Sequence, residues 1–231
     1  MRTIVESDSD FFCDIQAPCF RSLNEEEADI VRASRTQVQF RKGENLTKQG
    51  AFASYVLFMV TGIARQYVEG EGGRDFNLRI IIPGEFVGLS AVFSGNLFTY
   101  SAVALADCQA YLIEKEAISK VLKHNPQFTY SIIKRYCDHN TSLMNTVSSV
   151  VFKQMNGRMA EALLYIDNLR TADDSVFIHL SRKELADFAG ISMESAVKLL
   201  KSFEKDGLIK LQDKDIRILS REKLAEISRR G

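Results

Sequence analysis

The chain has 231 residues, of which 45% are hydrophobic and 26% are charged, and its 30 basic and 30 acidic side chains leave no formal net charge. This composition is typical of an ordinary globular protein, and the length allows two compact domains. No apolar run approaches the ~18 residues of a membrane-spanning helix, and the polar, acidic first thirty residues do not resemble a signal peptide. Four cysteines without dense spacing indicate a reducing, cytoplasmic location, so we expect no membrane partner.

The first half of the chain changes from a helical to a strand-like pattern. The acidic turn from Asn24 to Glu27 predicts a helix that ends near Ala33. Short β-rich runs then alternate with glycines up to about residue 112, and several closely spaced strands with glycine turns indicate an antiparallel sandwich or roll. The predicted strands are Gln37–Arg41, Tyr55–Thr61, Ile63–Val68, Phe76–Ile82, Tyr100–Ala106 and Gln109–Ile113.

A long helical pattern follows, from Asn125 to Met155. Pro126 fits its first turn, because the N–H groups of a first turn have no partner within the helix. Six side chains recur at heptad spacing: Ile133, Tyr136, Asn140, Leu143, Val147 and Val150. A stripe along a helix of about 45 Å is costly to expose, so we predict a dimerisation helix in which Asn140 fixes the register. The alternative is that the stripe packs against the roll of its own chain.

The last third of the chain begins with a second predicted helix (residues 157–169) and a polar turn region (171–175). Helix-start and helix-stop signals follow. Ser181 is a predicted N-cap with Glu184 as its capping-box partner, and Gly190 ends that short helix. Ser192 begins another helix, which stops at Gly207. Two apolar runs (208–211 and 216–219) around a polar turn predict a β-hairpin. Two helices joined by a glycine turn and followed by a hairpin describe a winged helix-turn-helix.

The segment 180–209 resembles the DNA-reading unit of the CRP/FNR regulators, the family of the cyclic-AMP receptor protein and the fumarate–nitrate regulator. The shared pattern is Ser181-Arg182, the turn at Gly190, and Ser192-x-Glu194-Ser195-x-x-Lys198. The glycine-bounded run 84–95 is similar to the family's β-roll. The resemblance implies an α+β protein with a β-roll sensor domain (1–124), a dimerisation helix (125–155) and a winged helix-turn-helix domain (156–231). It implies a homodimer that binds palindromic double-stranded DNA.

The resemblance also implies which side chains contact DNA. The base contacts would be Met193, Glu194, Ser195 and Lys198, and the phosphate contacts would be Ser181, Arg182, Lys183, Ser192 and Lys201. A glutamate can accept from the cytosine amino group, whereas Lys198 lacks the two-pronged donor of the family's usual arginine. Met193 replaces the arginine of the cyclic-AMP receptor, so we expect a different target site. The alternative for Glu194 and Lys198 is an intrahelical ion pair.

An effector pocket is implied on the roll at Gly88, Leu89, Thr99 and Tyr100. The family binds cyclic AMP there through a Gly-Glu pair and an Arg-Ser pair, and this chain has neither the glutamate nor the arginine. A buried phosphate diester without an arginine lacks its charge-assisted partner, which argues against cyclic AMP. An unknown small-molecule effector, or none, remains.

Two cofactors stay open as alternatives, and neither is predicted. Iron–sulfur ligation would use Cys13, Cys19 and Cys108, but the family's first N-terminal cysteine falls on an aspartate here and its roll cysteine falls on a tyrosine. Haem would need one of His124, His139 or His179. We expect Cys137 to be a small core residue, and we predict no metal site.

No enzyme motif competes with the regulator hypothesis. The chain has no P-loop, GxSxG or HExxH pattern, and three scattered histidines do not form a cupin-type site. We therefore predict that the chain is not an enzyme. The runner-up is a ligand-binding β-roll dimer whose main role is not base-specific reading. The resemblance also implies RNA polymerase as a partner.

Overall fold

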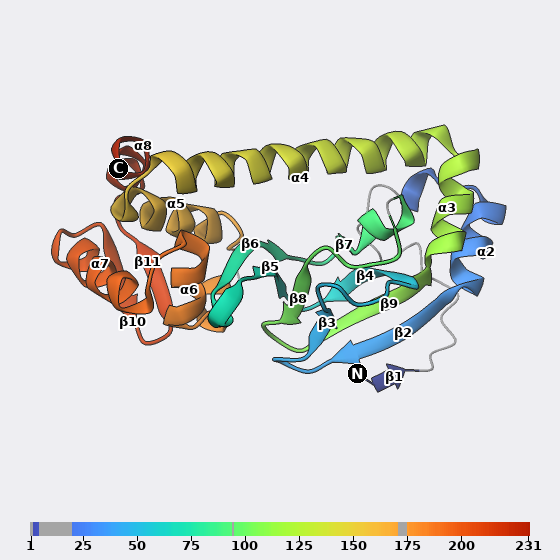
Figure 1. The fold of residues 1–231 in the computed structure, drawn as a ribbon, viewed down its shortest axis with the longest axis horizontal. Coiled ribbons are helices and arrows are strands. Elements are labelled where there is room, and N and C mark those ends of the chain that lie inside the picture. Colours follow the sequence, from blue (N-terminus) through green and yellow to red (C-terminus); the bar gives the residue numbers. More distant parts are fainter. Residues whose placement is uncertain (1, 5–19, 94, 171–174) are drawn as a thin grey trace. The chain divides into compact units, whose positions relative to one another are not determined.

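The computed structural model describes residues 2–4, 20–93, 95–170 and 175–231 (Figure 1). The described chain divides into two units. The first unit comprises residues 1–69 and 80–141, and the second comprises residues 70–79 and 142–231. In the described residues no helix has the length and apolar character that a membrane crossing needs.

The first unit contains two antiparallel sheets and short helices (Figure 1). One sheet has the strand order β1-β2-β9-β4-β7 and the other β3-β8-β5-β6, and residues 75–79 of β6 are counted with the second unit. The strands are β1 (Arg2–Ile4), β2 (Arg35–Phe40), β3 (Asn45–Thr47), β4 (Tyr55–Thr61), β5 (Ala64–Glu69), β6 (Asp75–Ile81), β7 (Phe86–Val87), β8 (Ser101–Ala104) and β9 (Cys108–Glu114). The helices are η1 (Phe20–Ser22), α2 (Glu25–Ala33), η3 (Leu89–Val92) and α3 (Lys115–His124).

Strand β4 lies at the centre of the roll because both of its faces are buried. Val56 and Phe58 point to one side, into a cluster that also includes α2, α3 and Phe128. Leu57 and Met59 point to the other side, into a cluster with residues of the second sheet. Since successive strand residues alternate between faces, an uninterrupted apolar run such as residues 56–60 is what a strand buried on both sides requires.

Helix α4 (Pro126–Phe152) begins in the first unit, and its N-terminal half packs on the roll. Phe128 and Ile132 are buried in the first cluster, and Arg135 Nη1 donates to the Gly84 carbonyl at 2.7 Å. The heptad stripe lies on another face. Its apolar members are 41–54% exposed and Asn140 is exposed too. Within the first unit, Ile133, Tyr136 and Asn140 therefore do not pack on the roll, which contradicts the alternative for this part of the stripe.

The second unit contains η2 (Glu71–Gly73), α5 (Met155–Asp167), η4 (Val176–His179), α6 (Arg182–Ala189), α7 (Met193–Lys205), β10 (Ile209–Gln212), β11 (Asp215–Ile218) and α8 (Arg221–Arg230). Strands β10 and β11 form an antiparallel hairpin with Leu211 opposite Ile216. The winged helix-turn-helix and the antiparallel roll predicted from the sequence are both confirmed. Helices α3 and α8 and the short strands β1, β3 and β7 were not predicted.

Candidate nucleic-acid interface and effector region

The turn between α6 and α7 follows the predicted local rules. Ser181 Oγ accepts from the Glu184 N–H at 3.2 Å, and Glu184 Oε2 accepts from the Ser181 N–H at 2.7 Å, which completes the capping box. Gly190 has a φ of 60°, a left-handed conformation that glycine tolerates best. A Cβ at this position would also lie 3.1 Å from the ring of Phe76. The turn that positions α7 therefore favours glycine for its conformation, and a side chain there would also crowd the Phe76 ring.

Helix α7 has a buried face and an exposed face. Its N-cap, Ser192, accepts from the Ser195 N–H at 3.2 Å, and Ala196, Leu200 and Phe203 are buried in the second unit. The opposite face is exposed at four predicted DNA-contact residues, which are Met193, Glu194, Lys198 and Lys201. The first turn thus presents free N–H groups and the positive end of the helix dipole beside polar side chains, an arrangement suited to phosphate and base edges.

Glu194 and Lys198 form no ion pair with each other or with any other described residue. The intrahelical pair that sequence spacing left open is therefore not formed in this structure. Met193 is 51% exposed at the start of the helix. Ser195 is half-buried, and its Oγ accepts from the Ser192 hydroxyl at 3.0 Å. Three of the four predicted base contacts, Met193, Glu194 and Lys198, are thus exposed within the first two turns of the helix.

Two of the three basic residues among the predicted phosphate contacts have partners within the chain. Arg182 Nη2 donates to the Asp213 carbonyl at 3.3 Å, and burial lowers the pKa of its guanidinium. Lys183 pairs with Asp187 at 3.1 Å. Lys201 has no partner among the described residues and is exposed. Of the three cations, Lys201 is therefore the one fully free to meet a phosphate.

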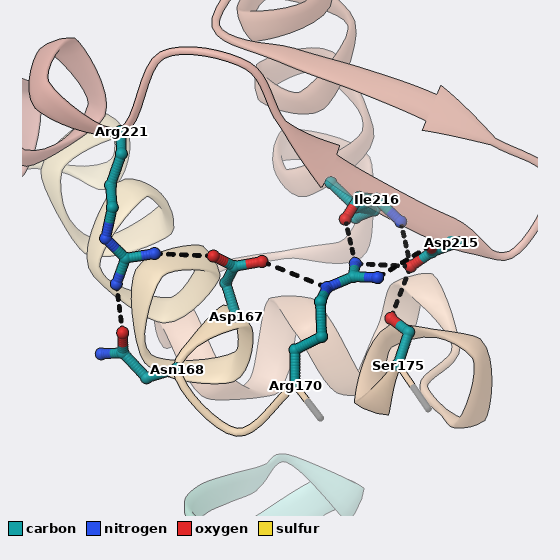
Figure 2. Close-up of polar contacts among 7 residues, drawn as sticks. All are labelled: Asp167, Asn168, Arg170, Ser175, Asp215, Ile216 and Arg221. Carbon is teal, nitrogen blue, oxygen red and sulfur yellow. Dashed lines mark hydrogen bonds and ion pairs between the residues drawn. The ribbon is translucent and has the colours of Figure 1, made fainter. Parts of the chain in front are cut away.

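A polar network holds the wing hairpin to the end of α5 (Figure 2). Arg170 Nη2 donates to Asp215 at 3.0 Å and to the Ile216 carbonyl at 2.9 Å, while its Nε faces Asp167 at 3.4 Å. Arg221 Nη1 donates to the other Asp167 oxygen at 2.6 Å. This network was not predicted from the sequence, where the residues after the second helix indicate only a turn. It fixes the wing that borders α6.

The carboxyl of Asp215 is the centre of that network. Burial alone would raise its pKa, but hydrogen bonds from Ser175 Oγ, at 2.6 Å, and from Arg170 outweigh burial and lower it below the ordinary value. The same pairing raises the pKa of Arg170. Both groups are therefore charged at neutral pH, and their attraction is present under physiological conditions.

The predicted effector residues are close together on the roll, and all of them except Thr99 already contact other residues of the chain. The Gly88 N–H donates to Tyr100 Oη at 2.7 Å, and a Cβ on Gly88 would lie 2.5 Å from the ring of Phe98. Leu89 is only 7% exposed and packs in the first buried cluster, whereas Thr99 is exposed. A ligand that binds the Gly88 N–H would therefore have to displace the Tyr100 hydroxyl from it.

The cysteine and histidine hypotheses stay as predictions, with one correction. Cys13 and Cys19 lie outside the described residues. Cys108 is buried, its Sγ donates to the Ile63 carbonyl at 3.2 Å, and burial raises its pKa to about 11. Cys137, expected in a core, is exposed on α4, because the chain buries the neighbouring Ile132 face instead. In the described residues no group of three or more histidine, cysteine or acidic side chains could hold a metal.

Comparisons with known proteins agree with this architecture. The family model for a cyclic nucleotide-binding domain matches residues 37–125, and that for a Crp-like helix-turn-helix domain matches residues 157–227. A CRP-like cAMP-activated global transcriptional regulator of Mycobacterium tuberculosis is 23% identical over 201 residues, which cover 83% of this chain and 88% of that protein. The transcriptional activator protein FnrA of Stutzerimonas stutzeri is 25% identical over 219 residues, which cover 90% and 87%.

Solved structures show the same fold. FixK2 from Bradyrhizobium japonicum gives a TM-score of 0.75 at 22% identity, covering 84% of this chain and 96% of that one. A CooA double mutant from Carboxydothermus hydrogenoformans gives a TM-score of 0.74 at 19% identity, covering 92% of this chain and 95% of that one. With an effector-binding domain matched before a DNA-binding helix-turn-helix, the chain belongs to the CRP/FNR family of transcription regulators, which are DNA-binding proteins and not enzymes.

Proposed function

We propose that this regulator works as a homodimer joined along α4 and that it reads a palindromic operator through two copies of α7. The exposed heptad stripe on α4 is the observation that supports a homodimer. Ile133 is 54% exposed and Val147 50% exposed, at seven-residue multiples along one helix face. Pairing two such stripes as a coiled coil buries them, and Asn140 at a seam position favours two in-register strands.

A twofold-symmetric dimer presents two α7 helices to two half-sites. For helix-turn-helix dimers the half-site centres lie about one helical turn, roughly 34 Å, apart, so we expect a palindrome with that spacing. Glu194 would accept from a cytosine amino group, Lys198 would donate to guanine or phosphate, and Met193 and Ser195 would complete the base contacts. Ser181, Arg182, Lys183, Ser192 and Lys201 would bind phosphates, with Arg182 and Lys183 first releasing Asp213 and Asp187.

The signal is proposed to act at the roll around Gly88, Leu89, Thr99 and Tyr100. A ligand that takes over the Gly88 N–H would displace the Tyr100 hydroxyl and so shift the balance between DNA-competent and incompetent dimers. Although the Mycobacterium tuberculosis relative is named as cAMP-activated, we do not propose cyclic AMP here. The chain has no arginine beside Ser101 to pair with a cyclic phosphate, and Leu89 stands where that subsite would need a glutamate.

Selection of binding sites from a random duplex library tests this function. The full-length protein should enrich one palindromic site, and sedimentation equilibrium on the same sample should give a dimer mass. Failure to enrich any site, with the dimer intact, would favour the alternative of a ligand-binding β-roll dimer. Isothermal titration of cyclic AMP should show no saturable heat, and a micromolar dissociation constant would contradict the proposal for the roll.

A further inference from the structure

A cavity of about 210 Å³ is lined only by residues of the second unit. None of the proposed effector residues lines it. Four segments line it: residues 76–78 of β6, the C-terminal half of α4, the middle of α5, and the end of α6 at Phe188 and Ala189. Phe188 and Ala189 directly precede the Gly190 turn that positions α7. A molecule in this cavity would therefore contact the same element that sets the direction of the reading helix.

Arg158 lines this cavity, and its guanidinium has no partner among the described residues. Its Nε atom is buried and makes no hydrogen bond, and no ion pair or hydrogen bond of this side chain occurs among the described residues. Its Nη1 lies 3.7 Å from where a Cβ of Gly190 would be. A buried guanidinium N–H with no acceptor is energetically costly, because the group loses water without gaining a replacement. An anion in the cavity would remove that cost.

The one carboxylate in the cavity lining is already neutralised. Glu161 pairs with Lys153 at 3.2 Å and also accepts a hydrogen bond from the Ser149 hydroxyl. Arg158 therefore contributes a positive charge that no side chain in the cavity balances. The rest of the lining is mixed. Phe76, Leu78, Val150, Tyr165 and Phe188 are apolar or aromatic, and Ser142, Asn145 and Thr146 are polar.

We propose that this cavity binds a small organic anion with a flat apolar body, whose carboxylate or phosphate group pairs with Arg158. Arginine can bind a carboxylate or a phosphate through two parallel hydrogen bonds, so the Arg158 side chain suits either group. The cavity volume is below the 300–1,000 Å³ typical of drug-sized ligands, so the ligand has on the order of ten non-hydrogen atoms. This site goes beyond the proposed function, since binding here requires neither DNA nor a ligand on the roll.

Isothermal titration of the full-length protein with benzoate, phenyl phosphate and benzamide tests the proposal without DNA. At least one anion should bind saturably, and the neutral benzamide should bind at least about tenfold more weakly, because it cannot form the charge-assisted pair. Binding of benzoate alone would identify a carboxylate ligand, and binding of phenyl phosphate alone a phosphate ligand. Absence of saturable binding by either anion, or equal binding of benzamide, would overturn the proposal.

Three variants assign the binding to this cavity. Arg158→Gln should weaken anion binding by at least about tenfold, and Arg158→Lys should retain part of it because the charge remains. Arg229→Gln removes the same charge from an exposed position on α8 and should leave binding unchanged. Ala162→Leu fills the cavity from α5 and should abolish binding of both anions, which keeps the test decisive if Arg158→Gln fails to fold. Unchanged binding in a folded Arg158→Gln or Ala162→Leu protein would place the anion elsewhere and refute the assignment.

Discussion

The outer face of α7 and the effector region of the roll differ in how their polar groups are satisfied. On α7, Glu194, Lys198 and Lys201 are exposed and have no partner among the described residues. On the roll, the Gly88 N–H is already bonded to Tyr100 and Leu89 is buried. A surface that leaves charges unpaired costs little in water and is ready for an external ligand, whereas a self-paired region must first break its own contacts. The difference predicts that substitutions on the exposed faces of α4 and α7 alter dimerisation or DNA binding, and that substitutions in the roll alter the free energy of unfolding.

The largest effect is expected at the exposed stripe of α4. Leu143→Glu would place two like charges at the centre of the dimer seam and should convert the dimer to monomers. A monomer binds only one half-site, so operator affinity should fall by about 10²–10⁴-fold. Sedimentation equilibrium and fluorescence anisotropy with the selected operator measure both effects. Ser148→Glu puts the same charge on an exposed position of α4 outside the stripe and should change neither. A Leu143→Glu protein that stays dimeric would refute the seam.

The next effect concerns specificity on the outer face of α7. Glu194→Ala should reduce discrimination at one base pair by roughly 1–3 kcal/mol, because the cytosine amino group loses its acceptor. Non-specific binding should be mostly unchanged. Anisotropy titrations with every single-base operator variant would find the affected position, and unchanged discrimination at all positions would show that Glu194 does not contact a base.

Inside the roll, Cys108 should make stability sensitive to alkali. Its folded-state pKa is raised by burial to about 11, above the ~8.5 of an unfolded cysteine. The stability that the neutral thiol contributes is therefore fully present below pH ~8.5 and is lost as pH rises toward 11. Urea unfolding between pH 7.5 and 10.5 should show a steeper decline for the wild type than for Cys108→Ala. Cys137→Ser, at the exposed cysteine, should keep the wild-type slope.

A smaller effect separates the two regions directly. Tyr100→Phe removes the hydroxyl that pairs with the Gly88 N–H and should lower the free energy of unfolding by about 1 kcal/mol. Operator specificity should not change, because the α7 contacts are untouched. Chemical denaturation and the same operator panel measure these two results. A loss of base discrimination in Tyr100→Phe would show that the roll alters the α7 base contacts themselves, and not only the balance between DNA-competent and incompetent dimers.

The smallest effect is expected at Lys201. Lys201→Ala should weaken binding to all sequences alike, and the slope of log affinity against log salt should fall by about one unit per half-site for the lost phosphate contact. Titrations at several salt concentrations on operator and non-operator DNA measure it. Lys205→Ala, an exposed lysine at the end of the same helix, offers a control. A selective loss on the operator alone would indicate a base contact instead.

Local rules predicted the reading unit well because its signals lie within a few residues. Ser181 with Glu184, Gly190 and Ser192 each fix a helix end through contacts three or four residues apart or through backbone conformation. Helices α3 and α8 were missed for the converse reason. Their N-cap residues are Glu114 and Ser220, and neither makes a side-chain cap hydrogen bond. Without an N-cap signal, such helices resemble extensions of the preceding strand.

Long-range partners were beyond the sequence. Arg170 and Asp215 are 45 positions apart, and Gly88 and Tyr100 lie on different sides of a loop. Their residue types permit pairing but do not require it, because surface arginines and aspartates are usually solvated. The same applies to Arg158, whose lack of a partner becomes visible only when the elements around it are placed. The described structure supplied the pairing, whereas the family motif supplied the predicted DNA contacts.

The second unit is discontinuous in sequence, and this affects how the protein can be divided. Asn77 is only 1% exposed, and its Nδ2 donates to the Glu184 carbonyl at 3.0 Å, while Phe76 lies against Gly190. A fragment that starts at residue 142 would lack residues 70–79. The surface that Phe76 and Asn77 cover near Gly190 and Glu184 would then be exposed to solvent. The isolated C-terminal fragment should therefore be partly unfolded and prone to aggregation unless a peptide spanning residues 70–79 is added.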